Sequence, residues 1–373
     1  MRMTEYKFYY RGEKMNIPKP KSILILLLTL LFVIPCSAAQ ERFPGKTWTK
    51  AGKPEDLGYS SEKLETAKKF TETLKTSAVL IVVDGIILYE WGEVEKRFMS
   101  HSTRKSLLSA LCGNYVKNGT IDLDITIEEF GIDDKPPLSD VEKKATVRDC
   151  IKARSGIYHM ALYESARMKA LKPERHSVRP GTHWYYNNWD FNVFCTIFEK
   201  STGKKIFEAM TEEIAIPIGM EDFTAENGWY VNGEESIHPA YPFAITARDF
   251  ARFGLLMLRK GNWNGKQVIP RGWVEESTRY HSDANLYGVD GYGYMWWVAR
   301  DHNSFPHLPN VKLKEGTYSA RGAGGHYVII IPEHDMVFVH RVNTYLRGHQ
   351  VSAADVGTLL QMIFDAKTIS PVK

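Results

Sequence analysis

A serine and a lysine three residues apart are the most informative chemical feature of this 373-residue chain. They lie in Ser102-Thr103-Arg104-Lys105, at the start of a stretch with a helical pattern. Residues three apart on a helix share a face, so the amine of Lys105 can reach the hydroxyl of Ser102. A serine hydroxyl is a weak nucleophile until a neighbouring group takes its proton. The spacing therefore predicts a nucleophile activated by Lys105, although a helix start rich in serine and lysine also produces it by chance.

A second segment, Pro180–Asn188, holds a tyrosine followed two positions later by an asparagine. Such a loop could supply a phenol that shuttles protons and an amide that orients a substrate. Two registers fit the sequence, either Tyr185 with Asn187 or Tyr186 with Asn188. A polar turn among packed aromatic side chains is the structural alternative.

The third segment is the glycine-rich Ala320–Gly325, which runs into the β-rich residues Tyr327–Ile331. Glycines let a substrate approach the backbone closely, and N–H groups at a strand edge can stabilise an oxyanion. A strand rather than a helix follows, so the segment is not a dinucleotide-binding fingerprint. A tight turn before a strand is its structural alternative. His326 follows the glycines directly and is a candidate contact for a substrate.

Hydrophobic periodicity indicates the elements that must position these segments. Asp84-Gly85 joins two β-rich runs and is a strong hairpin signal, and a helix begins at Thr103 and is stopped by Gly119. Another helix begins after Thr246, and two strands and a helix end the chain. The expected strands are 78–83, 86–91, 327–331 and 336–342, and the expected C-terminal helix is 351–364.

Strands near both ends of the chain, with helices between and after them, indicate an α+β fold. The sheet is expected to be antiparallel and flanked by helices, because hairpins rather than helical crossovers join its strands. We predict a sheet domain built from residues 40–124 and 230–373, with a mostly helical domain of residues 125–229 inserted into it.

Residues 1–39 have the composition of a secretory signal peptide. An almost unbroken apolar run of twelve, Ile23–Ile34, follows two lysines and precedes Ser37-Ala38-Ala39. Twelve residues fall short of the roughly 20 that span a bilayer as a helix. We therefore predict cleavage after residue 39, export to the periplasm or the extracellular space, and no stable membrane span afterwards. Met15 is an alternative translation start, and Pro35 before Cys36 disfavours a lipoprotein.

Charge and cysteine content argue against several classes of function. Residues 1–39 carry six Lys or Arg and two Asp or Glu, which leaves 42 residues of each sign in the mature 334 residues. A neutral mature chain gives no indication of nucleic-acid binding. Its three cysteines are too few for a disulfide scaffold, and Cys112 and Cys195 are expected to be buried thiols. The sequence holds no H-E-x-x-H or C-x-x-C motif, so it implies neither a metal nor an organic cofactor.

Other hydrolase architectures fit the sequence less well. No G-x-S-x-G segment is present, so an α/β-hydrolase is not expected. His159, shortly after Ser155-Gly156, is expected to pack or to form hydrogen bonds rather than to catalyse.

In their order and spacing, the three segments resemble the serine β-lactamase and penicillin-binding protein superfamily, and in particular its class C-like branch of esterases and amide hydrolases. The run from Ser102 to Lys105 matches the S-x-x-K motif of this superfamily, and Pro180-Gly181-Thr182 places its Tyr-x-Asn motif at Tyr186 and Asn188. Flanking matches lie at 153–156, 247–254 and 291–297. The resemblance covers essentially the whole mature chain and implies a β-lactamase/transpeptidase-like fold.

One segment departs from the pattern of β-lactamases. Where they carry K-T-G, this chain has Ala320-Arg321-Gly322, so the lysine expected to bind the carboxylate of a penicillin is missing. The shortened form resembles that of 6-aminohexanoate-dimer hydrolases and related esterases. Substrate contacts are expected from Asn188, Gly322 and His326, and the resemblance assigns the second oxyanion N–H to Ala323. Arg321 either replaces part of the lost charge at the substrate or faces away from the cleft.

These observations predict an exported serine hydrolase that acts on small esters, amides or peptides through an acyl-serine intermediate. Ser102, Lys105 and Tyr186 form the expected catalytic set, and Ser102 and Ala323 supply the oxyanion N–H groups. Whether Lys105 or Tyr186 is the base stays open, because coupled groups titrate together. The alternatives are a weak β-lactamase or D-amino-acid peptidase, and a non-catalytic relative that binds cell-wall peptides. The complete set of serine, lysine and tyrosine disfavours the non-catalytic alternative.

Overall fold

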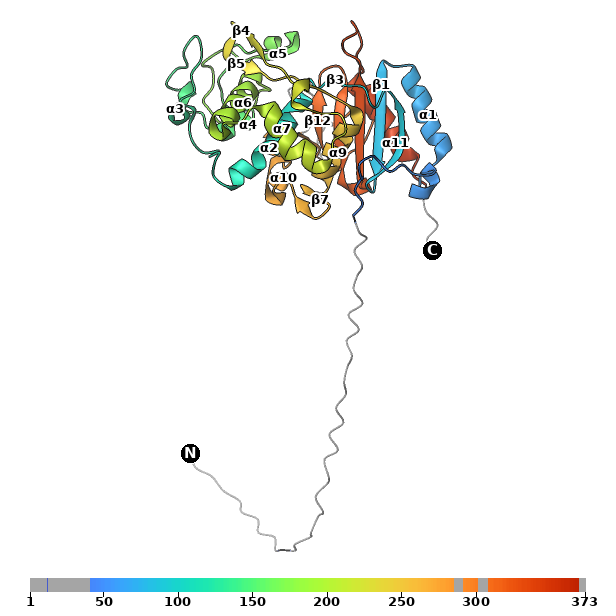
Figure 1. Cartoon of the computed structure of the whole chain (residues 1–373). Helices are drawn as coiled ribbons and strands as arrows, with labels where there is room; N and C mark the ends of the chain where they lie inside the picture. Colours follow the sequence, from blue (N-terminus) through green and yellow to red (C-terminus); the bar gives the residue numbers. More distant parts are fainter. Residues whose placement is uncertain (1–11, 13–40, 285–290, 301–307, 369–373) are drawn as a thin grey trace, which may run out of the picture. The chain divides into compact units, whose positions relative to one another are not determined.

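The structure of the protein is a computed structural model that describes residues 12, 41–284, 291–300 and 308–368. Apart from residue 12, the predicted signal peptide lies outside the described residues, and so do Met15 and Cys36. Residues from Glu41 onward form one compact unit around a large sheet (Figure 1).

The sheet has eight strands in the order β2-β1-β14-β13-β12-β11-β10-β9, and every neighbouring pair is antiparallel. Its strands are Thr76–Val83 (β1), Ile86–Gly92 (β2), Ser282–Asp283 (β9), Gly291–Tyr292 (β10), Trp297–Val298 (β11), Tyr318–Gly322 (β12), His326–Ile331 (β13) and Met336–Val342 (β14). The α+β fold with an antiparallel sheet against helices, predicted from the sequence, is confirmed.

The hairpin between β1 and β2 turns at Asp84 and Gly85, whose φ angles are 51° and 70°. Both residues therefore lie in the left-handed region that two-residue hairpin turns require, which explains why the Asp-Gly pair was informative. On its other side β1 pairs with β14, so a strand from the start of the unit lies beside one made near the end of the chain.

Helices cover both faces of the sheet. Along β1, Leu80 and Val82 belong to one apolar cluster, and Val79 and Ile81 belong to another. This alternation follows from the period of two along a strand. The first cluster includes side chains of α2 (Thr103–Lys117) and α9 (Ala247–Leu258), and the second includes side chains of α1 (Ser61–Glu72) and α11 (Ala353–Asp365) (Figure 1).

The chain between α2 and α9 is mostly short helices and loops. Its α-helices are Ile127–Phe130 (α3), Val147–Ile151 (α4), Ala166–Leu171 (α5), Asn188–Thr202 (α6), Ile206–Met210 (α7) and Ile216–Ile218 (α8), with a π-helical turn at Thr211–Ala215 (η3). Its short strands are Val231–Gly233 (β4), Ser236–Ala240 (β5) and Ala244–Ile245 (β6). The division into two domains at residues 125 and 229 stays a prediction.

Smaller elements complete the described fold. They are the 3₁₀ turns Pro54–Leu57 (η1), Glu142–Lys144 (η2), Ala225–Asn227 (η4) and Pro332–His334 (η6), the strands Phe98–Met99 (β3), Asn262–Trp263 (β7) and Lys266–Gln267 (β8), and the helix Arg271–Ser277 (α10).

Helix α2 carries the serine and the lysine singled out from the sequence. Ser102 is its N-cap residue, and His101 before it has a φ of 47°, in the left-handed region. The His101 Nε2 lies 2.7 Å from Thr344 Oγ1, so the strained residue is held by the loop after β14. The start of α2 is thereby fixed to the sheet.

Within the described ranges, no helix is both long enough and apolar enough to cross a membrane. The same ranges contain no cluster of three or more His, Cys, Asp or Glu side chains arranged to hold a metal ion. The three cysteines of the described chain are buried free thiols, as predicted for Cys112 and Cys195.

Candidate active site

Lys105 brings three of the predicted site residues together. Its Nζ lies 3.0 Å from Ser102 Oγ, 2.6 Å from Tyr186 Oη and 2.7 Å from Asn188 Oδ1. Ser102 lies one turn earlier at the start of α2, whereas Tyr186 and Asn188 lie at the start of α6, 81 and 83 residues further along the chain. The contact between the two helices thus places a hydroxyl, an amine and a phenol in one hydrogen-bonded cluster.

The amine of Lys105 is enclosed by the protein. The side chain is 1% exposed, and Nζ lies 4.2 Å and 4.6 Å from the ring centroids of Tyr186 and Phe191. Burial lowers the pKa of Lys105 well below the usual 10.5, and the charge of Arg104 lowers it further. A larger fraction of this amine is therefore neutral at pH 7 than in an exposed lysine, and a neutral amine can accept a proton.

The pKa of the Tyr186 phenol is shifted in the opposite direction from that of Lys105. Burial raises the pKa of Tyr186 to about 12, although a hydrogen bond with Ser102 and the charges of Arg104 and Arg321 act in the opposite direction. The ring also stacks on Trp297, with centroids 5.1 Å apart. The phenol is therefore protonated at neutral pH and is suited to donate a hydrogen bond or a proton.

The structure separates the two possible registers of the tyrosine–asparagine pair. Tyr185 is turned away from the serine, and its hydroxyl donates a hydrogen bond to the carbonyl oxygen of Met168 at 2.7 Å. Tyr186 and Asn188 are the pair that contacts Lys105. This is the register that the family resemblance indicated.

Asn188 lies behind the lysine. Its side-chain oxygen accepts from Lys105, and its Nδ2 donates to the carbonyl oxygens of Leu162 at 3.3 Å and Tyr163 at 2.5 Å. The residue is 2% exposed and is not among the residues that line the neighbouring pocket. The structure thus places Asn188 as a support for Lys105, and its contact with a substrate stays a prediction.

The glycine-rich segment forms the turn between β12 and β13, close to Ser102. Gly325 has a φ of 102°, which side chains other than glycine rarely adopt. A Cβ on Gly322 would lie 2.8 Å from the carbonyl oxygen of Ser100, so the turn can approach α2 only because this residue is glycine. Among the described residues, the N–H groups of Ser102 and Ala323 donate no backbone hydrogen bond, and both residues line one pocket. Two such donors can receive an oxyanion.

A pocket with a volume of ≈ 350 Å³ opens beside Ser102. Its described lining contains no Asp or Glu, and it combines aromatic side chains with arginines: Tyr163, Tyr186, Trp297, Tyr327, Arg104, Arg167 and Arg321. The guanidinium carbon of Arg321 lies 5.2 Å from the ring centroid of Trp297, so this side chain lies at the pocket rather than facing away from it. Ala320, at the position of the missing lysine, is fully buried.

His326 lies beneath the turn and not in the pocket. It is fully buried, and the Nε of Arg341 donates a hydrogen bond to its Nδ1 at 3.0 Å. Burial lowers the pKa of His326 well below 6.5, and the charge of Arg341 lowers it further. The structure therefore places His326 beneath the turn as a buried neutral side chain, and its contact with a substrate stays a prediction.

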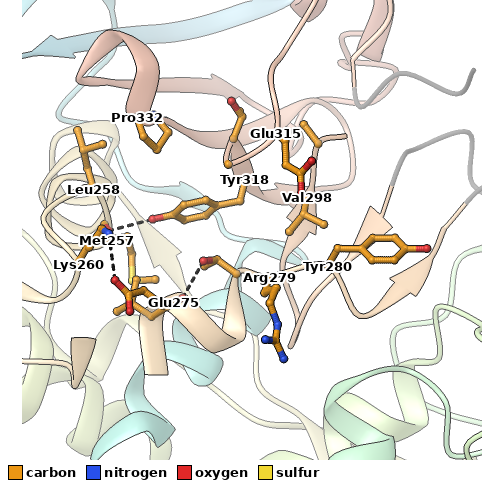
Figure 2. Close-up of a pocket in the computed structure, with 15 residues that line it drawn as sticks. Met257, Leu258, Lys260, Glu275, Arg279, Tyr280, Val298, Glu315, Tyr318 and Pro332 are labelled. Atoms are coloured by element: carbon orange, nitrogen blue, oxygen red, sulfur yellow. Dashed lines mark hydrogen bonds and ion pairs between the residues drawn. The ribbon is translucent and has the colours of Figure 1, made fainter. Parts of the chain in front are cut away.

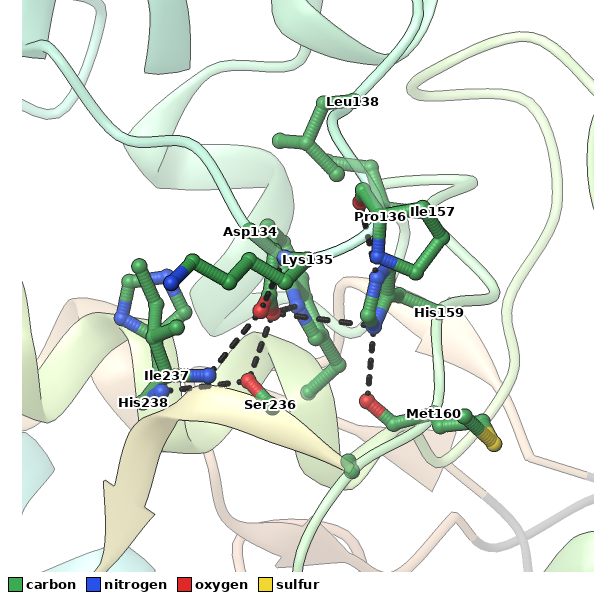
Figure 3. Close-up of polar contacts among 12 residues, drawn as sticks. Asp134, Lys135, Pro136, Leu138, Ile157, His159, Met160, Ser236, Ile237 and His238 are labelled. Atoms are coloured by element: carbon green, nitrogen blue, oxygen red, sulfur yellow. Dashed lines mark hydrogen bonds and ion pairs between the residues drawn. The ribbon is translucent and has the colours of Figure 1, made fainter. Parts of the chain in front are cut away.

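A second group of serine, histidine and aspartate lies outside the pocket (Figure 3). Ser236 Oγ donates to Asp134 at 2.5 Å, and His159 Nδ1 lies 3.6 Å from the same carboxylate. The His159 ring nitrogens already contact the carbonyl oxygens of Met160 and Pro136 at 2.9 Å and 3.1 Å. The serine hydroxyl faces the carboxylate and all three side chains are buried. The group therefore has a structural role, in which it holds neighbouring loops in contact. The packing role expected for His159 agrees with this position.

A second pocket of ≈ 290 Å³ lies between α9, α10 and the sheet (Figure 2). Unlike the pocket beside Ser102, its described lining holds no serine that contacts a lysine. Lys260 Nζ pairs with Glu275 Oε1 at 3.0 Å, and Tyr318 donates to the carbonyl oxygen of Met257 at 2.9 Å. Among the described residues that line it there is no serine, cysteine or histidine. This second pocket therefore lacks a nucleophile with an adjacent base.

Arg104 is the residue of the site that the sequence did not single out. It occupies a variable position of the S-x-x-K motif and lines the pocket. The first turn of α2 holds no acidic residue but carries both Arg104 and Lys105. Because the positive end of the helix dipole disfavours cations, two adjacent cations there were a sequence signal of function.

Comparisons with known proteins give one family model and several solved structures of similar fold. Residues 65–356 match the family model described as Beta-lactamase. A Bacillus anthracis protein named as a candidate 6-aminohexanoate-dimer hydrolase is 22% identical, with a TM-score of 0.61 over 87% of this chain and 88% of that one. A Mycobacterium bovis β-lactamase is 18% identical, with a TM-score of 0.56 over 80% and 96% of the two chains. EstCE1, a hydrolase with promiscuous acyltransferase activity, is 15% identical, with a TM-score of 0.57 over 84% and 98%.

At these identities the structural likeness shows a shared fold, while the family model covers most of the sequence. The chain belongs to the Beta-lactamase family of serine hydrolases.

Proposed function

We propose that this protein is an exported serine hydrolase that cleaves esters or amides through an acyl intermediate on Ser102. The observation that carries the proposal is the 3.0 Å contact between Ser102 Oγ and the buried amine of Lys105. A serine so placed at the start of a helix, beside a base and open to a pocket, has what nucleophilic catalysis requires.

Lys105 is the base in this proposal. Its neutral amine has one lone pair and two N–H groups, which match its three neighbours: the lone pair accepts the Ser102 proton, and the N–H groups donate to Tyr186 and Asn188. Tyr186 keeps its own proton at rest, because burial raises the pKa of its phenol to about 12. The tyrosine then relays a proton between Lys105 and the leaving group.

The reaction has two halves. Ser102 Oγ bonds to the substrate carbonyl carbon as its proton passes to Lys105, and the carbonyl oxygen becomes an oxyanion facing the N–H groups of Ser102 and Ala323. The carbon–oxygen or carbon–nitrogen bond then breaks, and the leaving group takes a proton through Tyr186. In the second half a water molecule repeats the same proton transfers and releases the acid.

Small esters and amides are the proposed substrates. The lysine that would bind the carboxylate of a penicillin is replaced by the buried Ala320, which disfavours efficient β-lactam hydrolysis. A weak β-lactamase or a D-amino-acid peptidase is the alternative, and nitrocefin assayed beside nitrophenyl esters separates it from the proposal. Export rests on the composition of residues 1–39, and cell fractionation with N-terminal sequencing of the mature protein tests it.

A fluorophosphonate probe tests the nucleophile. It should label the folded protein once, and mass spectrometry should locate the adduct on Ser102. Ser102→Ala should lose both the adduct and the turnover of nitrophenyl esters, whereas Ser109→Ala should keep the labelling, since Ser109 Oγ donates to the carbonyl oxygen of Tyr294 inside the protein. An adduct on another serine would overturn the assignment.

A further inference from the structure

Arg104 is a buried cation without an anionic partner. Its side chain is 1% exposed, and its Nη1 donates a hydrogen bond to the carbonyl oxygen of His101 at 2.9 Å. Its Nε and Nη2 are buried and make no hydrogen bond. In the described part of the chain, no carboxylate forms an ion pair with this guanidinium.

Two aromatic rings lie close to this guanidinium. Its carbon lies 4.9 Å from the ring centroid of Tyr241 and 5.5 Å from that of Tyr163. Such contacts favour the cation but do not replace the hydrogen bonds that Nε and Nη2 lack. Burying charged N–H groups without partners is costly, so an arrangement of this kind points to a ligand.

The two unpartnered nitrogens indicate which chemical group of a ligand would fit beside Arg104. Nε and Nη2 lie on one edge of the planar guanidinium, and their N–H bonds run side by side. This fork matches the two oxygens of a carboxylate, which accept both bonds at once.

Arg104 lines the same pocket as Ser102. Arg321 lines the pocket as well, and its only hydrogen bond among the described residues is donated by Nη2 to Tyr327 Oη at 3.3 Å. The exposed Arg167 adds a third positive charge at the rim, and no acidic residue is among the described lining. Because the whole chain is nearly balanced, with 48 Lys or Arg against 44 Asp or Glu, this excess of arginine is specific to the pocket.

We propose that Arg104 and Arg321 bind a carboxylate of the substrate, so that the preferred substrates are esters or amides bearing a free carboxylate on the acyl or the leaving-group side. The inference rests on the proposed function, because it names the substrate class of the same site. The pocket volume of ≈ 350 Å³ suits small molecules such as half-esters of dicarboxylic acids or short peptides.

A competing role for Arg104 is to act on the lysine alone, since its charge also lowers the pKa of Lys105. The two roles give different results. A group that only tunes Lys105 changes the turnover of every substrate equally and moves the pH profile. A group that binds the substrate carboxylate changes the preference for charged over neutral substrates.

Three nitrophenyl esters measure that preference. 4-Nitrophenyl hexanoate is neutral, 4-nitrophenyl hydrogen adipate carries a carboxylate on the acyl side, and 3-carboxy-4-nitrophenyl hexanoate carries one on the leaving group. In Arg104→Met the ratio of kcat/KM for one of the anionic esters to that for the neutral ester should fall about ten- to a hundredfold, the worth of a hydrogen bond to a charged group. Arg321→Met should lower the same ratio, and Arg271→Met, on the surface of α10, should leave it unchanged.

A binding measurement separates this inference from the proposed function. Calorimetry with Ser102→Ala should detect adipate and not the neutral adipamide, and the Arg104→Met change in that background should weaken adipate binding at least tenfold. If the natural protein hydrolyses none of the esters but adipate binds in this way, the proposed function fails and the carboxylate site stands. If adipate does not bind, or if all esters lose turnover equally in Arg104→Met, the carboxylate site is wrong.

Discussion

Asn188 Oδ1 lies 2.7 Å from Lys105 Nζ, and the same side chain donates through Nδ2 to the carbonyl oxygen of Tyr163. The asparagine therefore fixes the position of the lysine without placing a negative charge beside it. A carboxylate at this position would favour the ammonium form of the lysine, whereas the neutral amide leaves the pKa of Lys105 under the control of burial.

Asn188→Asp tests whether the neutral amide keeps the pKa of Lys105 low. A carboxylate beside Lys105 should raise the pKa of the amine, so the acid limb of the kcat/KM profile should move to higher pH by roughly one to three pH units. Activity at pH 7 should fall and partly return at alkaline pH. Asn118→Asp, at the exposed end of α2, serves as the control and should not move the limb. A limb that stays in place in Asn188→Asp would show that Lys105 is not the titrating base.

Lys105→Ala and Tyr186→Phe should each lower kcat by roughly 10²–10⁴-fold, the usual contribution of a positioned proton-transfer group. The double variant should lose much less than the product of the single losses, since groups that act as a unit are not additive. Tyr185→Phe is the matched control, because its hydroxyl contacts Met168 and not the lysine. Near-normal turnover in Tyr186→Phe would remove the phenol from the mechanism.

Arg104→Met should make the protein more stable while it impairs the site. Replacing a buried, unpaired charge by an apolar side chain removes a desolvation cost, and we expect a gain of about 1–3 kcal/mol in the free energy of unfolding. Denaturant titration measures it. A fall in stability would mean that the guanidinium is held by partners which satisfy it.

Arg341→Met should change stability in the opposite direction from Arg104→Met. This arginine is also fully buried, but it donates to His326 and to the carbonyl oxygens of Ile245, Phe98 and Met99. Its loss leaves those acceptors unsatisfied, so the free energy of unfolding should fall by about 3 kcal/mol or more. The contrast between the two buried arginines separates a ligand-binding charge from a structural one.

Stability should decrease in mild acid. Burial lowers the pKa of His101 and of His340 to about 4, below the ordinary 6.5 of histidine. The unfolded chain therefore binds protons that the folded chain does not as pH falls from about 6.5 to about 4, and stability is lost over that window. The melting temperature measured against pH should show this slope, and His340→Asn should flatten it while His183→Gln, at an exposed site, should not.

The parts of the fold that the sequence predicted were those with local signals. Asp84-Gly85 gave a hairpin, and the strand Met336–Val342 was predicted with the bounds that the structure has. Strands β9, β10 and β11 were not predicted, because each is only two residues long and carries no alternation to read.

The sequence predicted those site residues that belong to motifs with a fixed spacing. Ser102, Lys105 and Tyr186 meet as expected, whereas the orientation of Asn188 and His326 depends on packing between distant segments, which spacing alone does not reveal. Arg104 was overlooked because the motif treats its position as variable.

Strand β14 lies between β1 and β13, although it is among the last parts of the chain to be synthesised. Until residue 342 is available, the β1–β2 hairpin has no neighbour along its inner edge, and the helix that carries Ser102 has no glycine turn to face. The pairing of β1 with β14 joins segments far apart in the sequence, and such pairing forms slowly. Until it forms, the partial chain exposes unpaired strand edges. The proposed hydrolase activity is therefore expected to be absent during synthesis of the chain and to arise only after β14 has been inserted into the sheet.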